Sequence, residues 1–135
     1  MNDAVAIKWI AALRSGDYIQ GSGALRRQTD EADEFCCFGV LCDLYAKEHP
    51  GARWETDPQS GGAPGRPTGF HPNGDPGFTY GMPPPPVLIW ANIQRYGDDD
   101  LVSSAWQNLA YLNDTHVSFE TIAARIKLLH EGTCL

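Results

Sequence analysis

The sequence has no long hydrophobic run and no positively charged leader. Its 135 residues contain no stretch of about 18 apolar residues, which argues against a transmembrane helix. The segment Met1 to Val5 carries no lysine or arginine and begins no signal-peptide core. We therefore expect a cytoplasmic protein, and the length suits one domain with one hydrophobic core.

Positive charge is scarce. Ten lysines and arginines stand against 17 aspartates and glutamates, which gives a formal net charge of −7 and a pI near 4.8. A surface of this sign repels phosphate backbones, so binding to nucleic acid is not expected. The acidic residues gather over 30–34 and 98–100. They form either two solvated loops or a patch that docks on a basic partner.

Cysteine pairs with metal-binding spacing are also missing. A zinc site needs four ligands, usually in CxxC pairs, whereas the four cysteines here are Cys36, Cys37, Cys42 and Cys134. The apolar setting of the first three predicts buried free thiols. A metal site, a disulfide and a reactive thiol are the alternatives. We therefore expect no metal and no cofactor.

No catalytic signature is present either. The sequence contains no HExxH, no GxSxG and no paired-carboxylate pattern. Asp114 and His116 could form an acid–base pair, but a capping and turn role is the simpler interpretation. Residues 20–23, QGSG, could cradle a phosphate, yet they lack the spacing of a P-loop and favour a tight turn. We expect a protein without enzymatic activity.

The most apolar segment is FCCFGVLCDLY, residues 35–45. Its length and the shared face of Phe38, Leu41 and Tyr45 favour a helix over a strand. Because apolar residues nearly encircle this helix, it should be the buried centre of the fold. Gly39 costs about 1 kcal/mol inside a helix, which predicts that another element packs closely against it.

The remaining elements follow from apolar spacing and from proline and glycine positions. Helices are predicted over 3–15, 87–96, 101–112 and 118–131, and Asn113 can take a left-handed cap conformation. The segments between the helices predict a strand or turn at 18–26, a polar acidic loop at 28–34 and a short strand at 53–56.

Residues 57–86 hold nine prolines and seven glycines. No regular element should run through most of this segment, apart from a brief strand at 78–80. A loop of this length in a small domain is usually functional or disordered. The predicted fold is therefore one α+β domain, mainly helical, with a small β-sheet or hairpin and a long Gly/Pro-rich loop over 57–86.

Three blocks of the sequence share a pattern with other proteins. Residues 35–44 follow a run close to YCCLGVLCDL, residues 9–26 follow W-x-x-A-L-R-S-G-x-Y-x-Q-G-x-G-x-L, and residues 109–123 follow L-x-x-L-N-D-x-x-x-S-F-x-x-I-A. In these blocks the chain resembles a family of small uncharacterised proteins of bacteriophages and prophages. His116 stands where members often carry glycine, and the Gly/Pro-rich middle is peculiar to this chain. The resemblance implies a phage origin and carries over no activity.

Within these blocks, two stretches lack an adequate structural explanation: the turn from Arg14 to Arg26, and the pair Asn113-Asp114. The residues for which we predict a ligand- or partner-binding role are Arg14, Tyr18, Gln20, Arg26, Asn113 and Asp114. If Arg14, Arg26 and Arg27 converge at the glycine turn, they form the best anionic-ligand site on the chain. Residues 109–126 also have the outline of a helix-turn-helix, but the second helix carries too little positive charge for DNA recognition.

These observations predict a non-enzymatic phage accessory protein that binds and inhibits a host factor, such as a component of antiviral defence, in the host cytoplasm. The alternative is a small-ligand binder that sequesters an anionic nucleotide through Arg14, Arg26 and the glycine turn. On the first hypothesis the long loop contacts the partner. Deleting Pro58 to Met82 would then leave the fold intact and abolish partner binding.

Overall fold

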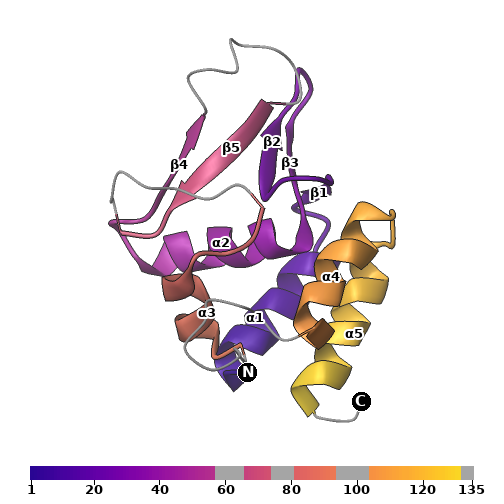
Figure 1. Ribbon diagram of the computed structural model, residues 1–135. Helices are drawn as coiled ribbons and strands as arrows, with labels where there is room; N and C mark the ends of the chain where they lie inside the picture. The colour runs from indigo at the N-terminus through magenta and orange to yellow at the C-terminus, as the bar shows by residue number, and fades with distance from the viewer. Residues whose placement is uncertain (57–65, 74–80, 94–103, 132–135) are drawn as a thin grey trace.

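Helices and a small sheet make up the computed structural model, which describes residues 1–56, 66–73, 81–93 and 104–131 (Figure 1). The helices are α1 (Asp3–Arg14), α2 (Cys37–Glu48), α3 (Pro85–Ala91), α4 (Ser104–Asp114) and α5 (Phe119–Glu131). The strands are β1 (Ile19–Gln20), β2 (Arg26–Gln28), β3 (Asp33–Phe35), β4 (Arg53–Thr56) and β5 (Arg66–His71). The predicted α+β fold, mainly helical with a small sheet, is confirmed.

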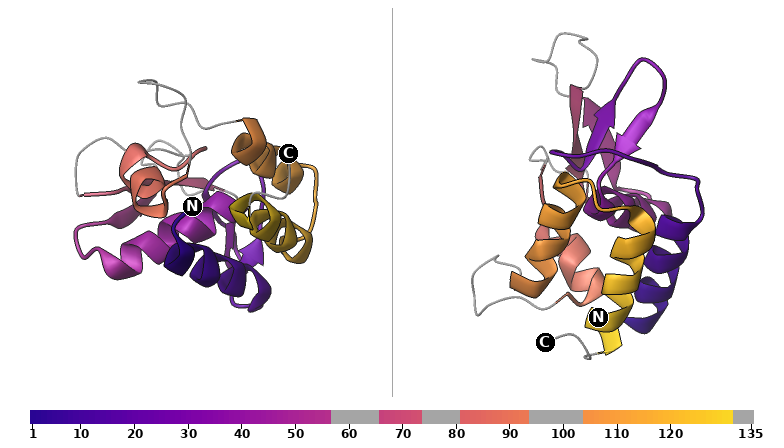
Figure 2. Two further views of the ribbon diagram at one scale, coloured as in Figure 1. Left: turned by 90° about the horizontal axis from the view of Figure 1, so that it is seen from below. Right: turned by 90° about the vertical axis from the view of Figure 1, so that its right-hand side faces the viewer.

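The sheet and the helices occupy opposite ends of the molecule, with α2 between them (Figure 1). The strand order is β1-β3-β2-β5-β4. Strands β1 and β3 run parallel, and the other described pairs are antiparallel. At the far end, α5 lies between α1 and α4, as both views of Figure 2 show. No helix within the described residues is both long enough and apolar enough to cross a membrane.

Helix α2 is the buried centre, as its apolar run predicts. Phe38, Leu41 and Cys42 have no exposed surface. The Trp9 indole nitrogen, from α1, donates a buried hydrogen bond of 2.9 Å to the Cys37 carbonyl. Gly39 lies directly against the Leu25 carbonyl oxygen, because a Cβ added to this glycine would be 1.7 Å from that atom. The predicted close packing against Gly39 is therefore confirmed.

The segment 57–86 is not all loop, so the long loop predicted over these residues was wrong in part. Strand β5 lies inside it and pairs with β2 on one side and β4 on the other. Its Phe70 is fully buried, and helix α3 already begins at Pro85. Proline and glycine have a low intrinsic preference for strands. In β5, pairing on both sides and the burial of the Phe70 ring outweigh this low preference. Deleting Pro58 to Met82 would remove β5 and could not leave the fold intact.

Three smaller predictions also differ from the observed structure. Residues 28–34 are not all loop, because β2 and β3 form a hairpin whose turn is closed by a hydrogen bond of 3.2 Å from Thr29 N to Ala32 O. The helix predicted over 87–96 ends at Ala91, because Asn92 takes the left-handed conformation at its C-terminus. Asn113 lies within α4, and the left-handed residue is His116, with φ of 69°.

Some predictions fall on residues that the structure does not describe. These are the strand at 78–80, the acidic cluster at 98–100 and the setting of Cys134. The start of the last helix is confirmed: α5 begins at Phe119, and the Ser118 hydroxyl accepts a hydrogen bond of 3.3 Å from Thr121 N. That bond satisfies one of the amides that a helix N-terminus leaves without an internal partner.

Candidate functional site

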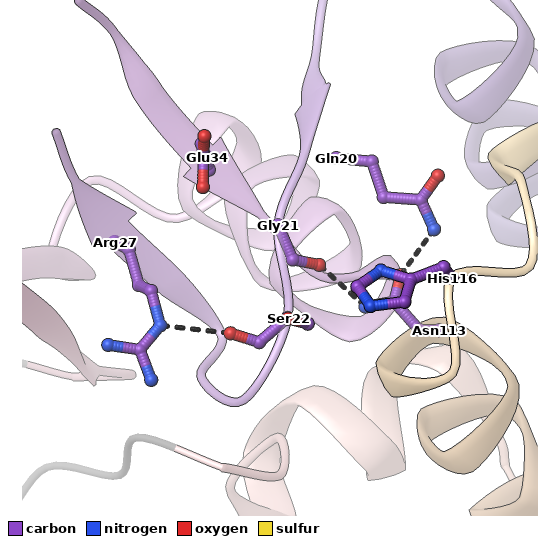
Figure 3. Close-up of a pocket in the computed structure, with 7 residues that line it drawn as sticks. All are labelled: Gln20, Gly21, Ser22, Arg27, Glu34, Asn113 and His116. Atoms are coloured by element: carbon purple, nitrogen blue, oxygen red, sulfur yellow. Dashed lines mark hydrogen bonds between the residues drawn. The ribbon is translucent and has the colours of Figure 1, made fainter. Parts of the chain in front are cut away.

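A polar pocket of about 340 Å³ lies where the glycine turn meets the loop between α4 and α5 (Figure 3). The residues that line it are Gln20, Gly21, Ser22, Arg27, Glu34, Asn113 and His116. They come from the end of β1 and the turn after it, from β2 and β3, from the end of α4 and from the loop that follows α4. Two of the six predicted site residues, Gln20 and Asn113, are therefore brought together, although 93 positions separate them.

Both polar atoms of the Asn113 side chain form hydrogen bonds with the protein. Its Oδ1 accepts hydrogen bonds of 3.1 Å from the Cys37 backbone amide and from Gln20 Nε2. Its Nδ2 donates to the Gly21 carbonyl at 2.7 Å. The residue is only 1% exposed. Asn113 therefore caps the N-terminus of α2 and holds the glycine turn at the same time.

Gln20 completes the arrangement from the other side. Its Nε2 also donates to the Val117 carbonyl at 2.6 Å, and its Oε1 accepts from the Phe119 backbone amide at 3.1 Å. Both protons and the oxygen of the Gln20 amide are thus in use. We call this pair of amides, with its backbone partners, the Gln20–Asn113 clamp. It joins the first and last sequence blocks to the start of α2.

Asp114 adds a bond at the rim of the clamp. Its Oδ1 accepts a hydrogen bond of 2.9 Å from the Gly23 backbone amide, in an exposed position. The carboxylate therefore supports the turn, which agrees with the capping and turn role favoured over an acid–base pair with His116. Three of the predicted site residues (Gln20, Asn113 and Asp114) thus share one place, and all three make bonds that hold the turn.

The arginines do not converge at the glycine turn. Arg14, at the end of α1, pairs with Glu120 of α5 at 3.1 Å. Arg26 pairs with Asp33, and its guanidinium lies 5.2 Å from the centre of the Phe35 ring. Of the three, the pocket is lined by Arg27 alone. The anionic-ligand site that would need all three arginines is therefore not assembled.

Tyr18 lies beside Arg26 rather than at the pocket. Its hydroxyl donates to Asp43 Oδ2 at 2.5 Å, and its ring meets the Phe35 ring edge-on at 5.0 Å. Burial, together with the hydrogen bond to Asp43, raises the pKa of Tyr18. The phenol therefore stays protonated and keeps its bond to α2. Tyr18 and Arg26 share contacts with Phe35 and form a packing cluster separate from the pocket.

Cys36, Cys37 and Cys42 are buried free thiols, as predicted. Cys36 Sγ accepts a hydrogen bond of 3.3 Å from Gly39 N and so caps α2. Burial raises the pKa of Cys36 to about 11 and the pKa of Cys37 and of Cys42 well above the ordinary value. Protonated, enclosed thiols are poor nucleophiles and poor metal ligands. Among the described residues, no group of three or more histidine, cysteine or acidic side chains could hold a metal ion.

Raising the pH above about 9 should destabilise the fold. The Cys36 thiol ionises near pH 9.0 in an unfolded chain and near 11 in the folded protein. The folded state therefore keeps a proton that the unfolded chain loses, so the free energy of unfolding falls between these pH values. For this thiol the loss reaches about 2 kcal/mol by pH 11 and levels off near about 3 kcal/mol above it. Urea unfolding at pH 7.5, 9 and 10.5, followed by tryptophan fluorescence, measures the change.

The matched variant for this measurement is Cys36→Ser, which keeps an atom that can cap α2 and removes the titrating thiol. Its free energy of unfolding should decline less steeply with pH than that of the wild type. An identical slope for the two proteins would contradict the role assigned to Cys36. Cys37 and Cys42 stay in both proteins, so their contribution cancels in the comparison.

Two apolar grooves flank α5, and the sequence patterns did not predict them. The α4–α5 groove, about 490 Å³, is lined by residues that include Leu112, Ala124, Arg125 and Leu128. The α1–α5 groove, about 370 Å³, is lined by residues that include Ile7, Ile10, Ala11, Arg14 and Lys127. We call the surface around both grooves the helical face. A signal was present in α5, where Ala124 and Leu128 are four residues apart on the side opposite the buried Ile122 and Ile126.

One comparison with known proteins gave a match. A family model described as a domain of unknown function, DUF8296, matches residues 1–130. Neither the curated proteins nor the solved structures contain a match. The match confirms the expected membership of an uncharacterised family, and the phage origin stays a prediction. Because the model spans nearly the whole length, this chain belongs to the family of the domain of unknown function DUF8296.

Proposed function

We propose that this protein is a non-enzymatic binding protein that captures a protein partner on its helical face. The partner presents an amphipathic helix with an apolar side and acidic flanks. In the bacteriophage setting implied by the sequence resemblance, that partner is a host factor, such as a component of antiviral defence, and binding inhibits it. The observation that carries the proposal is the pair of apolar grooves on either side of α5.

Apolar exposure on this face supports a protein partner. Ile7, on the α1–α5 groove, is 70% exposed, and Tyr111, on α4, is 65% exposed. Tyr111 lies three residues after Asn108, which lines the α4–α5 groove, so its ring stands beside that groove. Large apolar side chains exposed beside apolar grooves are typical of sites of association. Grooves between helices are the surfaces into which partner helices dock.

The positive charges beside the grooves support a partner with acidic flanks. Arg125 lines one groove and Lys127 the other, and neither forms an ion pair within the described part of the chain. Two unpaired cations on one helix are notable in a protein of net charge −7. Electrostatic complementarity of this kind steers association and selects the partner. A nucleic acid is a poorer candidate, because two cations neutralise few phosphates.

The nucleotide alternative receives less support. Arg14 and Arg26, which it requires, each pair with an acidic side chain and lie away from the glycine turn. The pocket that the turn does form contains the Glu34 carboxylate, which repels phosphate groups.

Blocking either groove should abolish capture of the partner. Ala124→Glu and Ala11→Glu each place a bulky acidic side chain at an exposed helical position that lines one groove. Glutamate is a good helix former, so the fold should be retained. We expect at least a tenfold loss of a specific partner in pull-downs from a bacterial lysate, read by mass spectrometry. The matched control is Ile89→Glu on α3, at a residue that is 67% exposed, and it should capture normally.

Site-specific crosslinking tests the same surface directly. The photoreactive amino acid benzoylphenylalanine at position 124 should crosslink to an acidic helical segment of the captured protein, and the same group at position 89 should not. Equal capture by the Ala124→Glu, Ala11→Glu and Ile89→Glu proteins would overturn the proposal. Retention of DNA or RNA instead of protein would do so as well.

A further inference from the structure

The polar pocket contains a carboxylate, that of Glu34, with no partner among the described residues. The side-chain oxygen and nitrogen atoms of Gln20 and Asn113 are bonded within the clamp, so both side chains are fixed at the wall of the pocket. The Glu34 carboxylate, by contrast, forms no hydrogen bond or ion pair with another described residue. It is half-buried at the pocket, where an ionised group without a partner is costly. A ligand group of positive charge would supply the missing partner.

A guanidinium stands next to that carboxylate. Arg27 and Glu34 are directly opposite each other in the β2–β3 pairing. Because side chains alternate along a strand, both point away from the sheet face that carries Phe35 and the core. Arg27 lines the pocket, and its Nε donates to the Ser22 carbonyl at 2.9 Å. The pocket therefore offers one group of each charge at neighbouring positions.

The glycine turn is fitted to these two side chains. A Cβ at Gly21 would lie 2.7 Å from the Glu34 Cβ, and a Cβ at Gly23 would lie 3.0 Å from Arg27 Nη2. Each glycine of the QGSG turn thus leaves room for one charged residue. In the view of Figure 3 the Gly21–Ser22 backbone runs between these two side chains and His116. Because the backbone of the turn lies so close to Glu34 and Arg27, it restricts the directions in which these two side chains can point.

We propose that this pocket binds a small zwitterion, an α-amino acid or a molecule that carries the same two groups. Its ammonium group binds the Glu34 carboxylate, and its carboxylate binds the Arg27 guanidinium. Opposite charges on adjacent strands match the short separation of the two groups in such a molecule. A volume of about 340 Å³ lies at the lower end of the range for ligand pockets, which suits a compact ligand. The exposed imidazole of His116 lies at the mouth, where it contacts the ligand's side chain.

The test is a binding survey with the twenty L-amino acids as probes. Each is added at up to 10 mM to the purified full-length protein, and binding is followed by the thermal midpoint and by calorimetry. We expect at least one amino acid to bind. Its N-acetyl form and its α-amide each lack one of the two charges, and each should bind at least tenfold more weakly. Inorganic phosphate and AMP should not compete.

Variants connect the binding to the proposed groups. Glu34→Gln keeps the shape of the side chain, removes the charge and should weaken binding of the amino acid at least tenfold. The matched control, Glu31→Gln, removes the same charge from an exposed position in the β2–β3 turn and should leave binding unchanged. If Glu34→Gln fails to fold, backbone amide shifts at Gly21, Glu34 and His116 on titration of the wild type provide the same information.

Three outcomes would overturn the proposal: no amino acid binds by 10 mM, the N-acetyl form binds as well as the parent, or Glu34→Gln binds like Glu31→Gln. The pocket and the helical face use different residues, so this proposal and the proposed function can fail separately. Groove variants such as Ala124→Glu should leave amino-acid binding intact, and Glu34→Gln should leave partner capture intact.

Discussion

Gly39→Ala should leave little or no folded protein. The new Cβ would stand 1.7 Å from the Leu25 carbonyl oxygen and 2.7 Å from the carbonyl carbon, and both are backbone atoms that cannot turn aside. Helix α2 would have to move away from the segment before β2, although its neighbouring side chains have no exposed surface. Overpacking a core usually costs about 1–3 kcal/mol, and a backbone clash of this depth should exceed that range. Small domains have about 5–15 kcal/mol of stability to lose.

Gly81→Ala is the matched control for this substitution. No atom lies within 4 Å of a Cβ at Gly81, so the same chemical change should be neutral or slightly stabilising, by up to about 1 kcal/mol. Soluble yield and urea unfolding, followed by circular dichroism, measure both variants. A Gly39→Ala protein with an unfolding midpoint near that of Gly81→Ala would contradict the packing of α2 against residue 25.

Asn113→Ala should cost about 3 kcal/mol or more of the free energy of unfolding. The substitution leaves three groups without their partner: the Cys37 backbone amide, the Gly21 carbonyl and one proton of the Gln20 amide. A buried polar group left unsatisfied costs about 1–3 kcal/mol, and the bond to Cys37 N is fully buried. Urea unfolding, followed by tryptophan fluorescence, measures the loss.

The adjacent residue supplies the control for the clamp. Asp114→Ala removes one exposed hydrogen bond, to Gly23 N, and should cost less than about 1 kcal/mol. Asn113→Asp keeps the acceptor and loses the donor to Gly21. Its free energy of unfolding should therefore lie between those of Asn113→Ala and Asp114→Ala. A double-mutant cycle with Gln20→Ala should give a coupling energy above about 0.5 kcal/mol. Equal stability losses for Asn113→Ala and Asp114→Ala would argue against the clamp.

The sequence predicted the parts of the fold that depend on local pattern. The apolar run around α2 placed the buried helix, and Gly39 within it indicated the close packing found there. Strand β5 was missed because its stability comes from pairing with two neighbours, and such pairing leaves no local signal in a segment rich in glycine and proline. The hairpin of β2 and β3 was missed for a related reason: its residues are polar, and their strand character depends on register.

The candidate site was predicted in part. Gln20 and Asn113 were selected from the matching blocks, and the structure brings them together, but as a clamp whose amides are already occupied. Glu34 and Arg27 were not selected, because only the register of two short strands makes them neighbours. One signal was available in the sequence: His116 occupies a glycine position of the pattern, and it does take a left-handed conformation.

The Gln20–Asn113 clamp has a consequence for how the protein is made. It joins a turn near the start of the chain to residues up to 99 positions later. While the ribosome is still synthesising the middle of the chain, the Cys37 amide at the start of α2 has no partner. The apolar side chains of α2 are then still partly exposed to solvent. Contacts this distant in sequence form late and slowly. Nascent chains that stop before residue 113 would therefore expose an aggregation-prone segment, so the yield of native protein depends on completing translation.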